Sequence, residues 1–319
     1  MAIFMYPSNC CLMYQNTVVK SLEFKTATLA DRPWMNRILR EEGSRSTDFC
    51  FTSIFTWDQI FHQRVTQIDN RLAVRLIYQG APFYAFPVGT GDLEPVIMAL
   101  RYDAASFNVP FKLRGVTEKH RLELEAVFPG QFAFSTDENA FDYIYEVEKM
   151  ATLAGKKLHA KRNHINRCIE GNPDWSFEPI TLDNLPECFA MAQEWVSQHA
   201  NQRSYDSELY VLRRAVSNFA ALELEGGLLR VEGKVIAFTM GEVLTEDTYI
   251  IHFEKAFPSI QGAYPMINRE FARFIQETHP HLKYINREDD MGIEALRKAK
   301  RSYYPAFLLE KYTAVWREA

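Results

Sequence analysis

Asn286-Arg-Glu-Asp-Asp-Met-Gly-Ile-Glu-Ala-Leu-Arg-Lys-Ala-Lys-Arg-Ser-Tyr-Tyr-Pro305 is the stretch around which the chain is organised. It follows a short apolar run, places three acidic residues in a row and then takes the composition of a helix. Asp289 or Asp290 can cap that helix, because a short carboxylate accepts hydrogen bonds from the free N–H groups of a first turn. The pattern predicts either a simple cap or a binding site at the carboxyl end of a strand.

The helix that follows these acidic residues is amphipathic on a 3.6-residue period. Its two sides favour two interpretations, a solvated charged face or a wall that holds anions. The apolar side holds Ala295, Leu296, Ala299 and Tyr303, and the basic side holds Arg297, Lys300 and Arg301, with Lys298 at its margin.

Length and composition indicate a globular protein of two domains. The 319 residues allow about 150 residues for each domain. A hydrophobic content of 47% and an aromatic content of 13% are typical of well-packed cores. With a net charge of −5 and a pI of about 6.0, no overall field attracts nucleic acid or an anionic membrane. Any site for a polyanion must therefore be a local basic patch.

The five cysteines form no Cys-x-x-Cys pair, and no histidine cluster joins them at metal-ligand spacing. We therefore expect free thiols, no metal site and a reducing, cytoplasmic location. No apolar run approaches the roughly 18–20 residues of a membrane span. Residues 1–21 lack the basic start and the cleavage site of a signal peptide, so we interpret them as an N-terminal extension, with the natural start possible further in.

Two strand-to-helix junctions resemble each other at a distance of 153 residues. Phe24, Thr28, Leu29 and Pro33 of the first junction recur as Phe177, Thr181, Leu182 and Pro186 of the second. Since this shift is nearly half the chain, the repeat predicts a duplicated domain.

A basic segment lies between the two halves: Leu153-Ala-Gly-Lys-Lys-Leu-His-Ala-Lys-Arg-Asn-His-Ile-Asn-Arg167. Read as one helix from Ala151 to Cys168, it has an apolar stripe of Ala154, Leu158, Ile165 and Cys168. Lys161 lies inside that stripe, so it must be paired, reach solvent or face a cavity. The segment is either a linker helix with a solvated face or a patch for phosphate or the end of a tRNA.

The second half is the clearer domain. Its pattern predicts a strand, two helices, three strands, a loop, a helix, a strand, a helix and a final strand at Ala306–Val315. Within the strand at Thr248–Lys255 the residues alternate, so that His252 and Glu254 lie on the same face as Ile250. Either side chain could act as the base of an acyl transfer, although polar positions on a half-buried strand explain them equally well.

This order of elements resembles the GNAT acyltransferase fold, and the chain resembles two such units in tandem. The basic segment and the stretch from Asn286 to Lys300 are similar to the hallmarks of a bacterial family related to the C-terminal catalytic domain of phosphatidylglycerol lysyltransferases and to Fem-type transferases. The resemblance implies an α+β protein with mixed sheets flanked by helices. It divides the chain into a first unit at 22–150, a basic linker helix at 151–172 and a second unit at 173–319.

The resemblance also implies an acyltransferase. Members of the wider group move an acyl or aminoacyl unit to an amine or a hydroxyl. GNAT enzymes hold the CoA pyrophosphate on backbone N–H groups of a loop, which here matches Gln261, Gly262 and Ala263 with only Gly262 in agreement. This departure favours aminoacyl-tRNA as donor over acyl-CoA, and a non-catalytic RNA-binding or regulatory protein stays open. No further cofactor is implied, and the acceptor is a small molecule, a lipid or a peptide.

The candidate residues follow from these patterns. Those expected to be catalytic are His252, Glu254, Glu288 and Asp290. Those expected to bind the donor or substrate are Lys161, Arg162, Asn163, His164, Asn286, Arg287, Asp289, Lys298 and Lys300. No motif predicts a Ser-His-Asp or Cys-His catalytic set.

Overall fold

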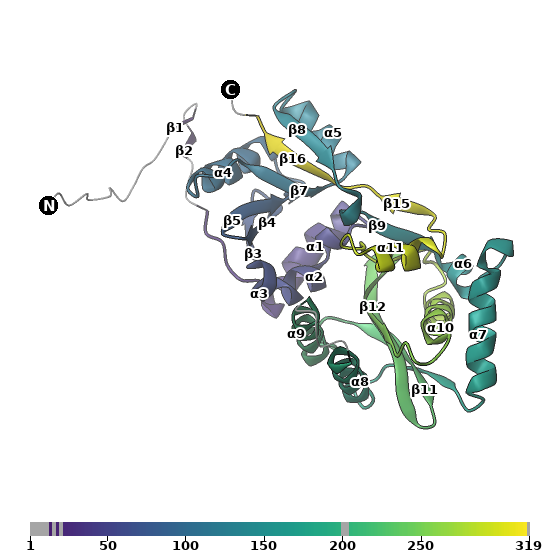
Figure 1. Cartoon of the computed structure of the whole chain (residues 1–319). Helices are drawn as coiled ribbons and strands as arrows, with labels where there is room; N and C mark the ends of the chain where they lie inside the picture. Colours follow the sequence, from purple (N-terminus) through teal and green to yellow (C-terminus); the bar gives the residue numbers. More distant parts are fainter. Residues whose placement is uncertain (1–12, 15–16, 19–21, 199–203, 318–319) are drawn as a thin grey trace.

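The computed structural model describes residues 13–14, 17–18, 22–198 and 204–317 (Figure 1). The expected N-terminal extension thus lies almost wholly outside the described residues, apart from a hairpin of β1 (Met13–Tyr14) and β2 (Thr17–Val18). None of the helices in the described ranges has the length and apolar character that a membrane crossing requires.

Two large mixed sheets form the body of the protein. In spatial order, the first sheet contains β3 (Arg64–Ile68), β4 (Arg71–Tyr78), β5 (Ala81–Ala85), β7 (Lys112–Val116), β16 (Tyr312–Trp316) and β8 (Phe132–Thr136), with β6 (Val88–Gly89) beside β4. The second contains β10 (Ser176–Pro179), β11 (Glu225–Val231), β12 (Lys234–Thr245), β13 (Thr248–Ala256), β14 (Tyr284–Asn286), β9 (Asp142–Glu146) and β15 (Phe307–Leu309).

The two sheets share one topology. Strands β3, β4 and β5 form an antiparallel meander followed by a parallel strand, β7, and β11, β12 and β13 are followed by β14 in the same way. Helix α4 (Leu93–Ala105) connects the parallel pair of the first sheet, and α10 (Ala263–Thr278) connects that of the second. This correspondence confirms the expected fold of two tandem GNAT-like units.

Each unit completes the sheet of the other. β9, which ends the first half of the chain, lies between β14 and β15 of the second sheet. β16, which ends the second half, lies between β7 and β8 of the first. Figure 1 shows this crossing as the two yellow strands β15 and β16, which extend along different sheets. The predicted boundaries at residues 150 and 173 divide the chain by sequence position alone. In the structure, each sheet also contains one strand from the other side of these boundaries.

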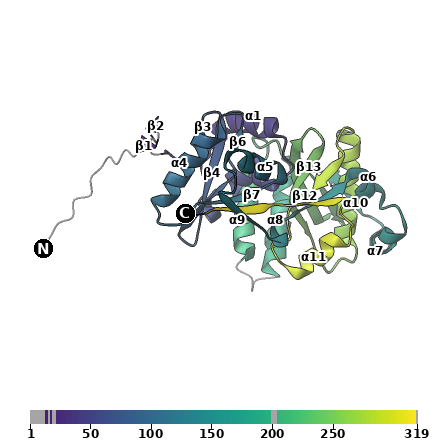
Figure 2. The same cartoon turned by 90° about the horizontal axis from the view of Figure 1, so that it is seen from above.

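Helices cover both faces of each sheet, because their apolar stripes need a partner surface. In the second unit, α8 (Leu185–Ser197) and α9 (Ser204–Ser217) lie on one side of β11 and β12, and α10 lies on the other with α7 (His159–Gly171) outside it (Figure 1). Figure 2 shows the two units side by side, with α11 (Glu294–Arg301) along one edge. The first unit adds α1 (Arg32–Glu42), α2 (Phe51–Thr56), α3 (Asp58–Phe61) and α5 (Glu118–Val127).

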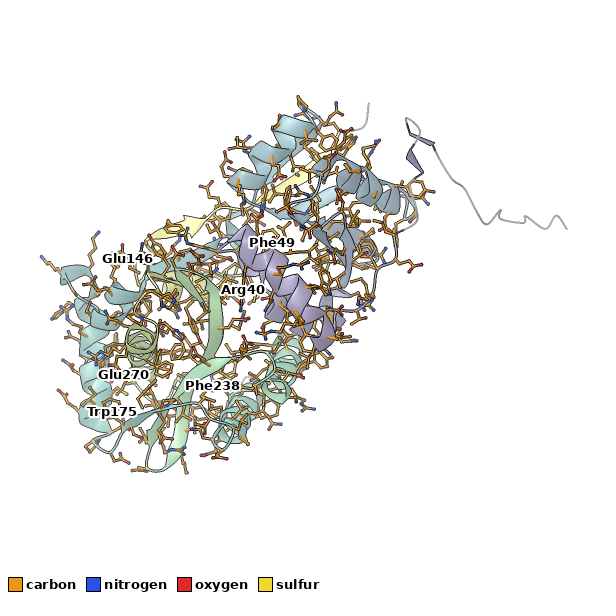
Figure 3. All side chains as sticks on the ribbon, turned by 180° about the vertical axis from the view of Figure 1, so that it is seen from behind. Arg40, Phe49, Glu146, Trp175, Phe238 and Glu270 are labelled. Atoms are coloured by element: carbon orange, nitrogen blue, oxygen red, sulfur yellow. The ribbon has the colours of Figure 1, made fainter. Side chains whose placement is uncertain are left out.

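One hydrophobic core extends through both units. Buried side chains of the first unit, such as Leu72 and Phe86, belong to the same cluster as Leu212 on α9 and Phe238 on β12. Phe238, labelled in Figure 3, has no exposed surface. Since each such side chain contributes about 1.5–3 kcal/mol on burial, the contact between the units is a core and not a loose interface.

The expected helix at Ala151–Cys168 is wrong in its continuity. Helix α6 (Val147–Thr152) ends at Leu153, which has φ 50°, and the chain turns again at Gly155 before α7 begins at His159. Leu158, Ile165 and Cys168 are buried as expected, but Ala154 is exposed because it lies in this turn.

The expected orientation of α11 is wrong in part, although Tyr303 is buried and Arg301 is exposed as expected. Ala295 and Ala299 are exposed, whereas Lys300 is buried. Lys300 Nζ donates hydrogen bonds to three successive backbone carbonyls, of Arg287, Glu288 and Asp289. The lysine points inward because its ammonium satisfies these three carbonyls. Leaving the carbonyls buried without hydrogen bonds would destabilise the fold more than burying the aliphatic part of the lysine does.

The predicted final strand is divided into two. Residues 307–309 pair in the second sheet as β15, and residues 312–316 pair in the first as β16. Between them, Lys311 Nζ lies 2.8 Å from Asp48 Oδ2 and 2.8 Å from Asp142 Oδ1, with only 5% of its side chain exposed. This ion triad, of which Lys311 and Asp142 are buried and Asp48 is partly exposed, lies at the point where the chain crosses from one sheet to the other.

We predict that Lys311→Ala lowers the free energy of unfolding by about 3–5 kcal/mol, because it leaves the buried Asp142 carboxylate without its cation and near the partly exposed Asp48 carboxylate. Urea unfolding followed by circular dichroism measures this loss. Lys298→Ala is the matched control, since the Lys298 side chain is 76% exposed and should contribute less than about 0.5 kcal/mol. A loss below about 1 kcal/mol for Lys311→Ala would contradict the role of the triad.

Candidate functional site

The two parallel strands β13 and β14 pair over only three residues each. Thr248, Tyr249 and Ile250 lie opposite Tyr284, Ile285 and Asn286, and beyond these positions the two segments no longer pair. We call the space between Ile251–Ala256 and Arg287–Asp290 the wedge. Because open sheets bind ligands outside the carboxyl ends of parallel strands, the wedge is the natural place for a site.

Two side-chain pairs cross the wedge. His252 Nδ1 lies 3.0 Å from Glu288 Oε1, and Arg287 Nη2 donates to Glu254 Oε1 at 2.8 Å. The residues that the strand alternation and the acidic turn predict independently thus meet as partners.

His252 belongs to a buried cluster that reaches the first unit. Its Nε2 lies 3.2 Å from Glu242 Oε1 on β12 and 3.7 Å from the thiol of Cys50, the residue that precedes α2. The thiol itself lies 3.0 Å from the same Glu242 oxygen. Sequence reasoning does not single out Cys50 or Glu242, although a carboxylate within the apolar run of β12 is a signal that could have found Glu242.

The electrostatics of this cluster do not favour a thiol nucleophile. Burial and the Glu242 carboxylate raise the pKa of Cys50, with His252 opposing them. Burial alone would lower the pKa of His252, but Cys50, Glu242 and Glu288 outweigh it and raise this pKa well above its ordinary value. Both ring nitrogens of His252 are engaged, so the geometry does not favour it as the base of an acyl transfer.

A second cluster lies on the other cross-wedge pair. We call Lys161, Glu254, Asn268, Arg287 and Tyr303 the Arg287 cluster. The Lys161 ammonium lies 4.0 Å from the centroid of the Tyr303 ring, and the Arg287 guanidinium lies 5.1 Å from it. Asn268 Nδ2 donates to Glu254 Oε1 at 3.1 Å. The helix α7, the strand β13, the helix α10 and the turn after β14 therefore converge on one point.

Several polar groups of the Arg287 cluster have no partner. Glu254 Oε2, Asn268 Oδ1 and Arg287 Nη1 are buried and make no hydrogen bond within the described residues. Within the described ranges, Lys161 likewise makes neither a hydrogen bond nor an ion pair. Because buried polar groups are nearly always satisfied, two acceptors and two donors left free in one cluster make it a candidate ligand site.

Lys161 is the most perturbed cation of this group. Burial and the neighbouring Arg287 charge lower the pKa of Lys161 from its ordinary value of 10.5 to about 8, with Glu254 partly opposing them. A substantial fraction of the amine is therefore neutral at mildly alkaline pH and able to accept a proton.

Other expected site residues serve the frame of the wedge. Asn286 is buried and donates to Asp142 Oδ2 at 3.0 Å. Asp290 caps the turn at Gly292, and although burial raises its pKa, hydrogen bonds from Arg297 and Tyr143 lower it to about 2. Lys300 holds the carbonyls of the acidic turn, and Lys298 is exposed beside Glu294.

The remaining candidates surround the wedge. Asp289 is half-buried, and burial together with Asp142 and Glu288 raises its pKa to about 7 against the opposing Lys311 and Lys300. Arg162 donates to the backbone of the turn that precedes α7, including the Gly155 carbonyl at 2.8 Å. The side chains of Asn163 and His164 are exposed on α7.

The loop at Gln261–Ala263 is poorly suited to a pyrophosphate. A Cβ on Gly262, which has φ 87°, would lie 2.1 Å from the carbonyl oxygen of His164, so α7 passes directly over the loop. The Ala263 N–H donates to the Ile260 carbonyl at 3.2 Å and the Met266 N–H to the Gly262 carbonyl at 3.0 Å, while Pro265 has no N–H. Few backbone donors therefore remain for the cradle that CoA needs.

We predict that Lys161→Met raises the free energy of unfolding at pH 7 by up to about 3 kcal/mol, because it removes a desolvated charge. The lowered pKa means that the folded wild type binds fewer protons than the unfolded chain between pH 8 and 10.5. The wild type should therefore gain stability as pH rises through this window, and the variant should lack that gain. Urea titrations at several pH values measure the difference.

Lys156→Met is the control for that series, since Lys156 is exposed on the same basic segment. Its stability curve should run parallel to that of the wild type. Parallel curves for Lys161→Met as well would show that Lys161 carries no burial penalty.

Comparisons with known proteins place these features in a family. Residues 39–315 match the family described as phosphatidylglycerol lysyltransferase, C-terminal. A solved structure from Bacteroides thetaiotaomicron, a conserved protein of unknown function, is 42% identical with a TM-score of 0.86, over 92% of this chain and 99% of that one. The C-terminal domain of a putative lysylphosphatidylglycerol synthetase from Agrobacterium fabrum has a TM-score of 0.64 at 14% identity, over 91% of this chain and 92% of that one.

Among curated proteins, an uncharacterised protein of Mycoplasmoides gallisepticum is 25% identical over 178 residues, or 55% of this chain and 56% of that protein. The match thus spans about half the length of the curated relative. At 14% identity the Agrobacterium structure shows the fold alone, and the match over residues 39–315 shows the family.

Proposed function

This chain belongs to the phosphatidylglycerol lysyltransferase C-terminal family, and on that premise we propose that it transfers an aminoacyl group from aminoacyl-tRNA to an amine or hydroxyl acceptor. Membership bears out the expectation of an acyltransferase. The donor, the acceptor and the residues that hold them are our proposal. An aminoacyl-tRNA donor would place the reaction in the cytoplasm, where tRNA is charged.

The free groups of the Arg287 cluster carry the proposal, because they complement an aminoacyl ester. Such an ester has an α-ammonium that donates hydrogen bonds and a carbonyl oxygen that accepts them. Glu254 Oε2 and Asn268 Oδ1 are free acceptors for the ammonium. Arg287 Nη1 and Lys161 Nζ are free donors for the carbonyl oxygen. An acyl group without an amine would leave the buried Glu254 Oε2 without a hydrogen bond.

The chemistry follows from these positions. The nitrogen or oxygen of the acceptor attacks the ester carbonyl carbon and forms the new bond, and the ester bond to the ribose oxygen breaks. The proton of the acceptor passes to the departing ribose oxygen. Arg287 and protonated Lys161 are suited to stabilise the negative oxygen that develops on the way, while neutral Lys161 is suited to carry the proton.

The surface beside Lys161 supports a tRNA donor. The exposed Lys156, Lys157 and Arg167 lie on the same basic segment as Lys161. Phosphate contacts from such residues would give binding that weakens steeply with salt. Because the net charge of the chain is −5, a polyanion needs a local basic patch, and this segment is the candidate for it.

A CoA donor is less well supported. The loop that would hold its pyrophosphate is covered by α7, and its first-turn N–H groups are largely used within the loop and helix. We expect CoA to leave the melting temperature unchanged. A rise of several degrees at millimolar CoA would favour the acyl-CoA alternative.

The decisive experiment follows the discharge of labelled aminoacyl-tRNA by the full chain. Because the relatives are named for lysyl transfer to phosphatidylglycerol, lysyl-tRNA with phosphatidylglycerol vesicles is the first pair to test, followed by other charged tRNAs with lipid, peptide and amine acceptors. We expect Arg287→Gln and Glu254→Gln each to lower the transfer rate by about 10²–10³-fold. Lys119→Ala is the matched control and should keep the wild-type rate, since the Lys119 side chain is 65% exposed and lies outside the proposed site.

Two outcomes would contradict the proposal. Discharge that is unaffected by Arg287→Gln and Glu254→Gln, with both variants folded by circular dichroism, would remove the Arg287 cluster from the reaction. Salt-sensitive tRNA binding without discharge, for every acceptor class, would favour the non-catalytic RNA-binding alternative.

A further inference from the structure

The cluster behind His252 has a second property that aminoacyl transfer does not use. Cys50 Sγ, Glu242 Oε1 and His252 Nε2 come from three elements and point at one another. They lie 3.0 Å apart from sulfur to oxygen, 3.7 Å from sulfur to nitrogen and 3.2 Å from nitrogen to oxygen. We propose that these three side chains bind a single Zn²⁺ ion that links the two units.

The spacing of the donor atoms fits a zinc site. Zinc bonds of about 2.3 Å to sulfur, 2.0–2.1 Å to nitrogen and 2.0–2.2 Å to oxygen, set at tetrahedral angles, separate the donor atoms by about 3.3–3.6 Å. The three measured separations bracket this range, so binding requires movements of a few tenths of an ångström. A thiolate, an imidazole and a carboxylate together favour zinc over magnesium or calcium, which prefer oxygen ligands.

The surroundings of the donors are those of a metal centre. His252 directs its other ring nitrogen, Nδ1, at Glu288 Oε1, 3.0 Å away. Carboxylates in this position commonly orient the histidine ligands of zinc. Thr47 Oγ1 in turn donates to the same Glu288 oxygen at 3.1 Å. The imidazole is therefore held with Nε2 directed at Cys50 and Glu242.

A fourth ligand could come from a neighbouring cavity. This cavity of about 20 Å³, enough for about one water molecule, is lined by Cys50 and Glu242 but not by His252. Arg40 and Phe49, labelled in Figure 3, line the same cavity from the first unit. A protein ligand set of three with one open position is typical of zinc sites that bind water or substrate.

Binding replaces hydrogen bonds with metal bonds in a balanced way. Zn²⁺ from solution forms a bond to sulfur as the S–H bond of Cys50 breaks, and the proton leaves to solvent. His252 Nε2 also loses its proton to solvent and bonds through the freed lone pair, while its Nδ1–H stays directed at Glu288. The carboxylate of Glu242 supplies the third bond, so two protons leave for each ion bound. Because Cys50 belongs to the first unit and the other two ligands to the second, the ion would join them at the back of the wedge. This inference does not rest on the proposed transfer activity.

The test uses the full chain with Cys10→Ser and Cys11→Ser, which removes the two cysteines outside the described residues. After treatment with a chelator, Co²⁺ is titrated as an optical probe for the zinc site. We expect one Co²⁺ per chain with a near-ultraviolet thiolate-to-cobalt charge-transfer band, and loss of that band when Zn²⁺ is added. Zn²⁺ should also raise the melting temperature, because it binds the folded state only.

Variants decide which residues hold the ion. Cys50→Ser and His252→Gln should weaken Co²⁺ binding at least 100-fold, and Glu288→Gln should weaken it about 10–100-fold through the orientation of His252. Cys168→Ser and Cys188→Ser are matched controls, since both are buried free cysteines outside the cluster. They should keep the band and the affinity.

Three results would overturn the inference. They are the absence of stoichiometric Co²⁺ binding, a charge-transfer band that persists in Cys50→Ser, and a band that is lost in Cys168→Ser or Cys188→Ser. If circular dichroism shows that Cys50→Ser does not fold, Glu242→Gln and Glu288→Gln decide instead. Undiminished Co²⁺ affinity in both of those variants would overturn it as well.

Discussion

The separation of β13 from β14 is the constraint on which the rest of the structure depends. The two parallel strands pair over three residues and then part, and ion pairs fill the space between them: His252 with Glu288 and Glu254 with Arg287. A buried pair of this kind adds little net stability, because desolvation offsets the attraction. Its position at the carboxyl ends of parallel strands is better explained by binding than by folding.

The exchange of strands between the units positions the residues that line the wedge. β9 pairs with β14 and so positions the turn that carries Arg287 and Glu288. Lys311 lies between β15 and β16, where the chain passes from the second sheet to the first, and it pairs with Asp142 on β9. Buried side chains of both units also form a shared core. Residues from the first unit, Thr47 and Cys50, consequently reach the side chains of the second.

Much of this could be predicted from the sequence. The 153-residue repeat indicates two units, and the alternation along β13 with the acidic turn after β14 identifies His252, Glu254, Arg287 and Glu288 as candidates. The inward position of Lys300 could not be predicted, because the helical period does not show that one face of α11 lies against the backbone carbonyls of the acidic turn. Cys50 was beyond reach for a similar reason, since 192 residues separate it from Glu242.

The central claim is that the free polar groups of the Arg287 cluster hold an aminoacyl ester. A crystal structure of the chain with a non-hydrolysable lysyl-adenosine analogue tests it most directly. We predict that the α-ammonium lies within hydrogen-bond distance of Glu254 Oε2 and Asn268 Oδ1, with the carbonyl oxygen facing Arg287 Nη1 and Lys161. An analogue bound elsewhere, with those four groups unchanged and bridged only by water, would contradict the account.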